Sequence, residues 1–276
     1  MRRAARTLAA YGLLLGAALV FLAPVWFMLA GSLKPDARVL VEAGGAGAFW
    51  AAGGDWQNYR DVFQRVPFGR YLFNSLWITG AVVALGLAVN SLAGYALARL
   101  AWPGRRVLFG AVLVVLIVPL EAIAVPLFYE VTVLGWRDTY LVQILPFVAN
   151  AFSIYLFYTF FLGLPRALED AARVDGAGPW RTFLYVIVPV SRPAYAAVAV
   201  LTFLTQWGAY LWPLMVTTTE RVRPLPLGIA HFYTLPPLAW GDIFAFGCMM
   251  VAPVLGVFLL FQRWFVRGVA AAGIKG

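Results

Sequence analysis

The sequence predicts an all-α protein that crosses a membrane six times, and its composition, its long apolar stretches and their lack of alternation support this prediction. Of the 276 residues, 63% are hydrophobic and 12% are charged, whereas soluble domains are about 45–50% apolar and about 25% charged. The apolar stretches do not alternate with a period of two, as the strands of a membrane β-barrel would. The composition therefore indicates a polytopic helical membrane protein.

The apolar stretches are each about 20 or more residues, which is long enough for a helix to cross about 30 Å of hydrocarbon. The first follows Arg2, Arg3 and Arg6, as a signal peptide would, but it exceeds the 7–15 residues of a signal core, so we expect a retained helix. The predicted spans form a single transmembrane domain and cover residues 8–32, 75–97, 107–128, 141–162, 195–216 and 243–264.

The distribution of basic residues predicts the orientation. The side that holds both termini, with loops 98–106 and 163–194, carries 13 of the 21 Lys and Arg residues, and its net charge is +10 against zero on the other side. Because cytoplasmic loops are enriched in Lys and Arg, both termini should be cytoplasmic in a bacterial-type inner membrane. The total charge of +9 then reports topology and contact with lipid head groups, and nucleic-acid binding is not needed to explain it.

Single residue types exclude several kinds of site. One cysteine, Cys248, and one histidine, His231, leave no internal disulfide and too few ligands for a Cys or His metal site. Lys34 follows Leu33 and Lys275 follows Ile274, so neither lysine belongs to a phosphate-binding Gly-Lys loop. If ATP drives this protein, another subunit must bind the nucleotide.

The outer loop 33–74 is the longest predicted loop. Within it, the run 56–63 places aromatic and aliphatic residues at helical spacing with charges between them. This pattern predicts a short amphipathic helix on the outer membrane face, and a packed loop helix without a partner explains it equally well.

The cytoplasmic loop 163–194 predicts two short helices between spans. Pro165 suits a first helical position, Glu169 and Asp170 follow in the first turns, and Gly176 suits the left-handed position after the helix end. Pro179 begins a second helical piece that reaches Pro189. On spacing alone, a solvated connecting helix remains an equally good interpretation.

This loop resembles the cytoplasmic signature of binding-protein-dependent ABC importer permeases, which reads Glu-Ala-Ala, three residues, Gly, nine residues, Ile-x-Leu-Pro. The chain has Asp170-Ala171-Ala172, three residues, Gly176, nine residues and then Val186-Ile187-Val188-Pro189. Every spacing is kept, and Asp, Val and Val replace Glu, Ile and Leu. Glu169, beside Asp170, could share the acidic role.

The resemblance covers nearly the whole chain and is closest to the maltose-type permeases of carbohydrate uptake. Tyr95-Ala96-Leu97-Ala98-Arg99 followed by Pro103-Gly104 resembles that group at the end of the second span. One departure is Trp207-Gly208, where the family usually has Trp-Asn in the fifth span. A contact made by that amide is therefore not carried over.

The resemblance implies a fold and a set of partners. It implies a type I ABC importer permease that translocates a carbohydrate or related polyol and is not itself an enzyme. A second homologous permease would complete a heterodimer, a binding protein would deliver the solute, and two ATPase subunits would hold ATP and Mg, so this chain would bind no cofactor and no metal. A short coupling helix would dock on one ATPase, and the residues carried over to this coupling loop are Glu169, Asp170, Ala171, Ala172, Asp175, Gly176 and Pro189.

Polar and aromatic residues inside the spans are candidates for the translocation path. Polar groups at membrane depth usually face a bundle interior or an aqueous cavity, and aromatic rings can pack on sugars as well as at membrane interfaces. Interhelical hydrogen bonding is the competing explanation for each polar residue. The candidates are Glu121, Asn150, Gln206, Trp207 and Tyr210.

The sequence argues against two other classes of function. An ion-coupled secondary transporter needs ionisable residues in the membrane, and Glu121 is the only acid inside a predicted span. An intramembrane enzyme needs paired Asp residues, a His cluster or a Ser–His arrangement, and the spans contain none of these. Neither class explains the cytoplasmic signature.

Overall fold

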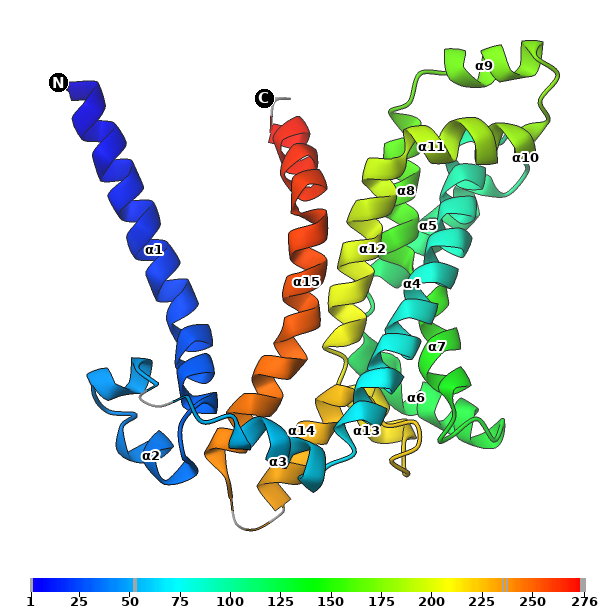
Figure 1. The fold of residues 1–276 in the computed structure, drawn as a ribbon. Coiled ribbons are helices and arrows are strands. Elements are labelled where there is room, and N and C mark those ends of the chain that lie inside the picture. Colours follow the sequence, from blue (N-terminus) through cyan, green and yellow to red (C-terminus); the bar gives the residue numbers. More distant parts are fainter. Residues whose placement is uncertain (1, 52–53, 235, 237, 274–276) are drawn as a thin grey trace. The chain divides into compact units, whose positions relative to one another are not determined.

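A computed structural model describes residues 2–51, 54–234, 236 and 238–273, and the side chains among them from 6 to 261. Every regular element in this part of the chain is helical (Figure 1). The chain divides into two compact units. Unit 1 contains the residues up to Gly69 and Leu227–Pro253, and unit 2 contains Arg70–Pro226 and the residues from Val254. Lys275 lies outside the described residues.

Unit 1 begins with the long helix α1 (Arg2–Ser32), which corresponds to the first predicted span. Two short helices follow, α2 (Asp36–Val41) and the 3-10 helix η1 (Ala46–Phe49). The predicted helix of the outer loop is present as α3 (Gln57–Arg65). The unit is completed by most of α14 (Leu225–Thr234) and the first part of α15 (Trp240–Gly273).

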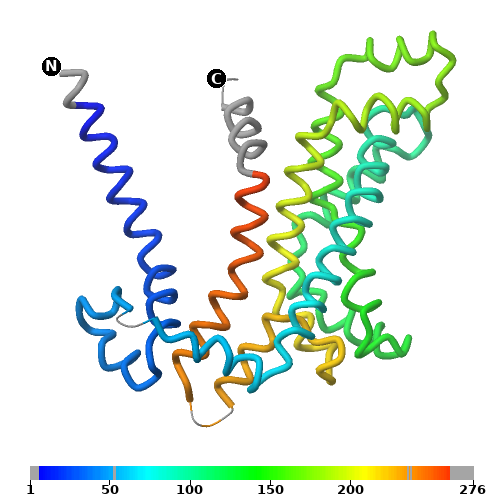
Figure 2. The backbone as a smooth tube through the Cα atoms, in the orientation of Figure 1, coloured from blue at the N-terminus to red at the C-terminus, as the bar shows by residue number. Residues whose placement is uncertain are grey.

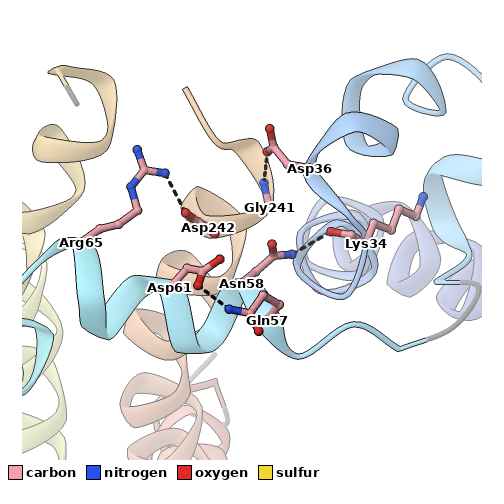
Figure 3. Close-up of polar contacts among 8 residues, drawn as sticks. All are labelled: Lys34, Asp36, Gln57, Asn58, Asp61, Arg65, Gly241 and Asp242. Carbon is pink, nitrogen blue, oxygen red and sulfur yellow. Dashed lines mark hydrogen bonds and ion pairs between the residues drawn. The ribbon is translucent and has the colours of Figure 1, made fainter. Parts of the chain in front are cut away.

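Polar contacts of α3 and the loop before it join the helices of unit 1 (Figure 3). The Asn58 side-chain amide donates to the backbone carbonyls of Ser32 and Lys34 at 2.9 and 2.8 Å, where α1 ends. Arg65 forms a 2.7 Å ion pair with Asp242 at the start of α15. Because Asn58 and Val62 are buried, α3 packs within its own unit, as the packed-helix interpretation of the outer loop requires.

Unit 2 contains most of α4 (Phe68–Arg99) and the helices of the chain as far as α13. These helices are α5 (Arg105–Ile117), α6 (Leu120–Val133), α7 (Tyr140–Val148), α8 (Ala151–Leu162), α9 (Ala167–Val174), α10 (Pro179–Thr182), the π-helical turn η2 (Phe183–Ile187), α11 (Val188–Val190), α12 (Arg192–Trp207) and α13 (Leu211–Val216). In both ribbon and tube views α9 runs beside the continuous α10–η2–α11 segment (Figure 2).

Two aromatic and aliphatic cores hold unit 2 together. One joins α4, α8, η2 and α12, and its buried members are Tyr95, Ala98, Phe157, Phe161, Phe183, Ile187 and Val198. The other joins α6, α7 and α13 through Val131, Val142, Trp212 and Val216. The first core therefore packs η2, from the 163–194 segment, against α4, α8 and α12.

Three of the predicted spans are interrupted in the structure. The span expected at 107–128 bends by 103° between α5 and α6, because Pro119 lacks a backbone N–H and disfavours helical geometry at Val118. The span expected at 195–216 stops at Trp207 and resumes at Leu211, since the ring of Pro213 is incompatible with a helical carbonyl four residues earlier. The span expected at 141–162 is interrupted at 149–150, between α7 and α8.

A side chain on α4 compensates for the last interruption. Asn90 donates to the carbonyl of Val148 at 3.0 Å and accepts from the backbone N–H of Asn150 at 2.9 Å. The Asn150 side chain in turn caps α8 by accepting from the N–H of Ser153. Among the described residues, four helical stretches are long and apolar enough to cross a membrane, with Tyr140–Leu162 counted as one of them. The number rises to six if two bent pairs are each counted as one span, namely α5 with α6 and the Pro179–Val190 segment with α12, which meet at 77°.

Candidate functional site: a cavity at three helix breaks and a docking helix

A cavity of about 490 Å³ lies within unit 2, where the three helix interruptions meet. Its walls include the first residues of α6, α8 and α13 and the last turns of α12. Irregular backbone at membrane depth is tolerated where it is covered by protein or lines a water-filled cavity. The breaks and the cavity are therefore parts of one feature.

Four of the five predicted path residues line this cavity: Glu121, Asn150, Gln206 and Tyr210. Glu121 is in the first turn of α6, directly after the break at Pro119. Asn150 and Tyr210 are the residues that precede α8 and α13. The sequence thus places polar groups at the points where the backbone leaves the helical path.

Trp207 does not line the cavity, although it was predicted with the others. Its side chain is 3% exposed and its ring stacks on that of Phe203, with centroids 5.3 Å apart. The last turn of α12 therefore directs Trp207 into packing and Gln206 toward the cavity. Adjacent residues on a helix point in different directions, so the sequence motif Trp207-Gly208 does not identify the path.

Sequence reasoning missed several lining residues. Thr202 and Thr205 line the cavity together with Gln206, and this spacing of three and four residues puts them on one face of α12. This spacing in the sequence could have identified Thr202 and Thr205 as lining residues. Aromatic rings complete the lining, namely Phe147, Phe152, Tyr210 and Trp212.

The second candidate site is α9 and the glycine that ends it. The predicted short helix is present, although it begins at Ala167, two residues after Pro165. Gly176 has φ +76°, as predicted, and its N–H donates to the carbonyl of Arg173 at 3.0 Å. Since a β-carbon is disfavoured at positive φ, glycine is the residue that suits this helix end. Pro189 lies within α11.

The acidic residues of α9 face opposite ways. Glu169 is 8% exposed and forms an ion pair with Arg99 at the end of α4, with 3.7 Å between Nε and Oε1. Asp170 is exposed, and its one ion pair among the described side chains is with Arg173 on the same helix, at 2.9 Å. Glu169 is therefore occupied within the chain, and Asp170 is the carboxylate that faces outward.

The remaining residues of the α9 segment also divide into buried and exposed ones. Ala172 is buried, whereas Ala171, Asp175 and Gly176 are exposed, and Val174 is 88% exposed. The outward face of α9 thus consists of Asp170, Ala171 and Val174.

Comparison with known proteins identifies the family. Residues 90–271 match the family described as "Binding-protein-dependent transport system inner membrane component". The chain belongs to this family. As a member, it is a permease subunit of an ABC transporter, which is a multi-pass membrane component and not an enzyme.

Individual relatives of this permease cover most of its length. The arabinooligosaccharides transport system permease protein AraQ of Bacillus subtilis (strain 168) is 33% identical over 264 residues, with 94% of this chain and 92% of AraQ covered. The sn-glycerol-3-phosphate transport system permease protein UgpE of Yersinia enterocolitica is 34% identical over 221 residues, covering 77% of this chain and 79% of UgpE.

A solved structure shares the fold. A chain from the crystal structure of a bacterial ABC transporter involved in the import of the acidic polysaccharide alginate superposes with a TM-score of 0.83, at 23% identity, over 96% of this permease and 98% of that chain. At this identity the likeness concerns the fold alone.

Proposed function

We propose that this permease is the translocation subunit of an ABC importer for a carbohydrate or related polyol, and that the cavity of unit 2 is its part of the solute path. The observation that carries this proposal is the family match across 90–271, because that segment contains α9 and every residue of the cavity lining except Val82. Relatives named for arabinooligosaccharides and diacetylchitobiose support the solute class.

The proposal counts six spans, with the α5–α6 pair crossing once and α12 continuing through the break into α13. Both termini and α9 would then lie in the cytoplasm, as the distribution of Lys and Arg residues predicts. In this topology the outer loop with α3 faces the binding protein, and α9 faces the ATPase. A second, homologous permease would close the cavity as a heterodimer.

The outward face of α9 is proposed as the coupling surface. Asp170, Ala171 and Val174 leave a small, partly apolar surface on a rigid helix, which suits a cleft on an ATPase subunit. ATP and Mg would be held by two such subunits. Closure of the ATPase pair would move α9, and through the first core it would move α4, α8 and α12 as rigid bodies.

An uptake assay tests this proposal. The chain would be co-expressed with its partner permease and ATPase, and the assembly would be reconstituted with the binding protein into vesicles loaded with ATP. We expect labelled solute to enter only when ATP, the ATPase and the binding protein are all present. Uptake that persists on a proton or sodium gradient without ATP would instead support a secondary transporter.

A further inference from the structure

The cavity in unit 2 carries charge of only one sign. Glu121 is its only carboxylate, and no Lys, Arg or His is among the described residues that line it. Glu121 forms no ion pair with any residue in the described part of the chain. Among the side chains that the structure describes, none therefore neutralises the negative charge of Glu121.

The rest of the lining is uncharged and suited to hydroxyl groups. Amides and hydroxyls of Asn150, Ser153, Thr202, Thr205 and Gln206 lie on the same surface as the aromatic rings. Amides and hydroxyls both donate and accept hydrogen bonds, while a carboxylate accepts strong, charge-assisted bonds from O–H donors. A phosphate or carboxylate next to Glu121, whose side chain is exposed to the cavity, would instead meet a like charge.

We propose that the solute path of this permease selects by charge. Glu121 makes the cavity favourable for an uncharged carbohydrate and unfavourable for a phosphorylated or uronic-acid sugar. This inference rests on the proposed function, and it narrows the solute class. The related proteins are named for uncharged and for anionic solutes alike, so family membership alone does not decide between them.

Thiol modification inside the cavity tests the proposal in the assembled transporter, whatever the identity of the solute. Thr205 lines the cavity and is exposed, so the substitution Thr205→Cys places a thiol in the cavity. The same variant carries Cys248→Ala, which removes the native thiol. Two methanethiosulfonate reagents of similar size, one with a sulfonate and one with a trimethylammonium group, then report the local charge. The ratio of the two reagents' reaction rates with a free thiol in solution is the reference against which the ratio in the cavity is compared.

We expect the cationic reagent to be favoured over the anionic one by about tenfold relative to that reference, as expected for one nearby charge in a partly wet site. Glu121→Gln should return the ratio close to the reference. Glu130→Gln is the matched control, because Glu130 is on the same helix and is exposed but does not line the cavity. That variant should keep the tenfold preference.

Two results would overturn the proposal. One is a preference for the anionic reagent, which would mean that the partner permease supplies the dominant charge. The other is a ratio that Glu121→Gln leaves unchanged. Neither result affects the proposed import function, which ATP-dependent uptake by the parent complex tests separately.

Discussion

Arg99 at the end of α4 and Glu169 on α9 form a buried ion pair, with 3.7 Å between Nε and Oε1. Arg99 also donates a hydrogen bond from Nη2 to the carbonyl of Leu164. The Arg99 guanidinium therefore contacts both the start of the 163–194 segment, at Leu164, and the helix α9 within it. At 3.7 Å the Nε and Oε1 atoms are too far apart for a hydrogen bond, so their attraction depends on both charges being present.

The first prediction concerns this pair. Glu169→Ala should lower the free energy of unfolding by about 3 kcal/mol, because it leaves the Arg99 charge buried and unpaired. The double change of Arg99→Met and Glu169→Met should recover most of the loss, since no unpaired charge remains. Thermal unfolding of the purified permease complex measures both.

The exposed pair on the same helix provides the control. Asp170 and Arg173 have side chains that are 63% and 72% exposed, so Asp170→Asn should change the free energy of unfolding by less than about 1 kcal/mol. Equal losses of unfolding free energy for Glu169→Ala and Asp170→Asn would show that the burial of Arg99 and Glu169 does not affect stability.

The second prediction concerns Gly176. Its φ of +76° is disfavoured for a β-branched residue by about 1–2 kcal/mol, and no atom lies within 4 Å of the position a Cβ would take. Gly176→Val should therefore displace the end of α9 through backbone strain alone. ATP hydrolysis that no longer drives uptake is the expected result in reconstituted vesicles.

Two variants show whether backbone conformation is the cause. Gly176→Asn should retain coupled uptake, because Asn tolerates the left-handed region. Gly178→Ala should also retain it, since Gly178 has φ −72° and open space around its Cβ position. Coupled uptake by Gly176→Val at the parent rate would refute the role assigned to the end of α9.

The third prediction concerns the crossing of α4 and α8 at Gly94. A Cβ there would lie 2.7 Å from Cβ of Phe157 and 3.0 Å from the backbone nitrogen of Tyr158. Gly94→Ala should therefore separate the helices and cost about 1–3 kcal/mol. Gly80→Ala on the same helix meets no atom within 4 Å and should be neutral or stabilising, because alanine favours helix. Similar unfolding midpoints for the two variants would contradict the close crossing.

The fourth prediction is a dependence on pH that comes from Asp138. Its carboxylate accepts hydrogen bonds from the N–H groups of Thr218 and Thr219 at 2.9 Å and from the Thr219 hydroxyl at 2.6 Å. Burial alone would raise the pKa of Asp138, but these hydrogen bonds outweigh it and lower the pKa below its usual value. The resulting stabilisation is present above the pKa of the unfolded chain and is lost as the pH falls through the folded one.

Melting temperatures of the parent and of Asp138→Asn should therefore differ at neutral pH and converge below about pH 4, near the ordinary pKa of an Asp side chain. Glu130→Gln, at an exposed carboxylate on α6, should give no such convergence. A difference between the parent and Asp138→Asn that stays constant from neutral to acid pH would exclude the charged form as the source of the effect.

The helices that depend on local sequence were predictable. The end of α9 at Gly176, the start of α10 at Pro179 and the helix in the outer loop follow from spacing, caps and amphipathic pattern. The interruption at Pro119 had its signal in the sequence as well, because proline cannot continue a helix there. Hydropathy alone does not reveal this interruption, since the apolar stretch continues past Pro119 without a change in composition.

The candidate site was predictable only in part. Glu121, Asn150, Gln206 and Tyr210 were chosen as polar or aromatic residues in apolar spans, and the structure brings them to one cavity. Trp207 was chosen on the same grounds and is packed against Phe203. Composition indicates which side chains are costly to expose to lipid. It does not indicate whether each of them packs against another side chain or faces a cavity.

By itself, the sequence determined that this protein is a helical membrane permease with a short helix in the 163–194 segment, because hydropathy and motif spacing are properties of the chain read in order. The tertiary structure decided that Glu169 faces Arg99 while Asp170 faces outward, and that three helix breaks share one cavity. Those outcomes depend on contacts between residues about 30 or more positions apart. Helical periodicity predicts which residues share a face of a helix, but it does not specify which distant element packs against that face.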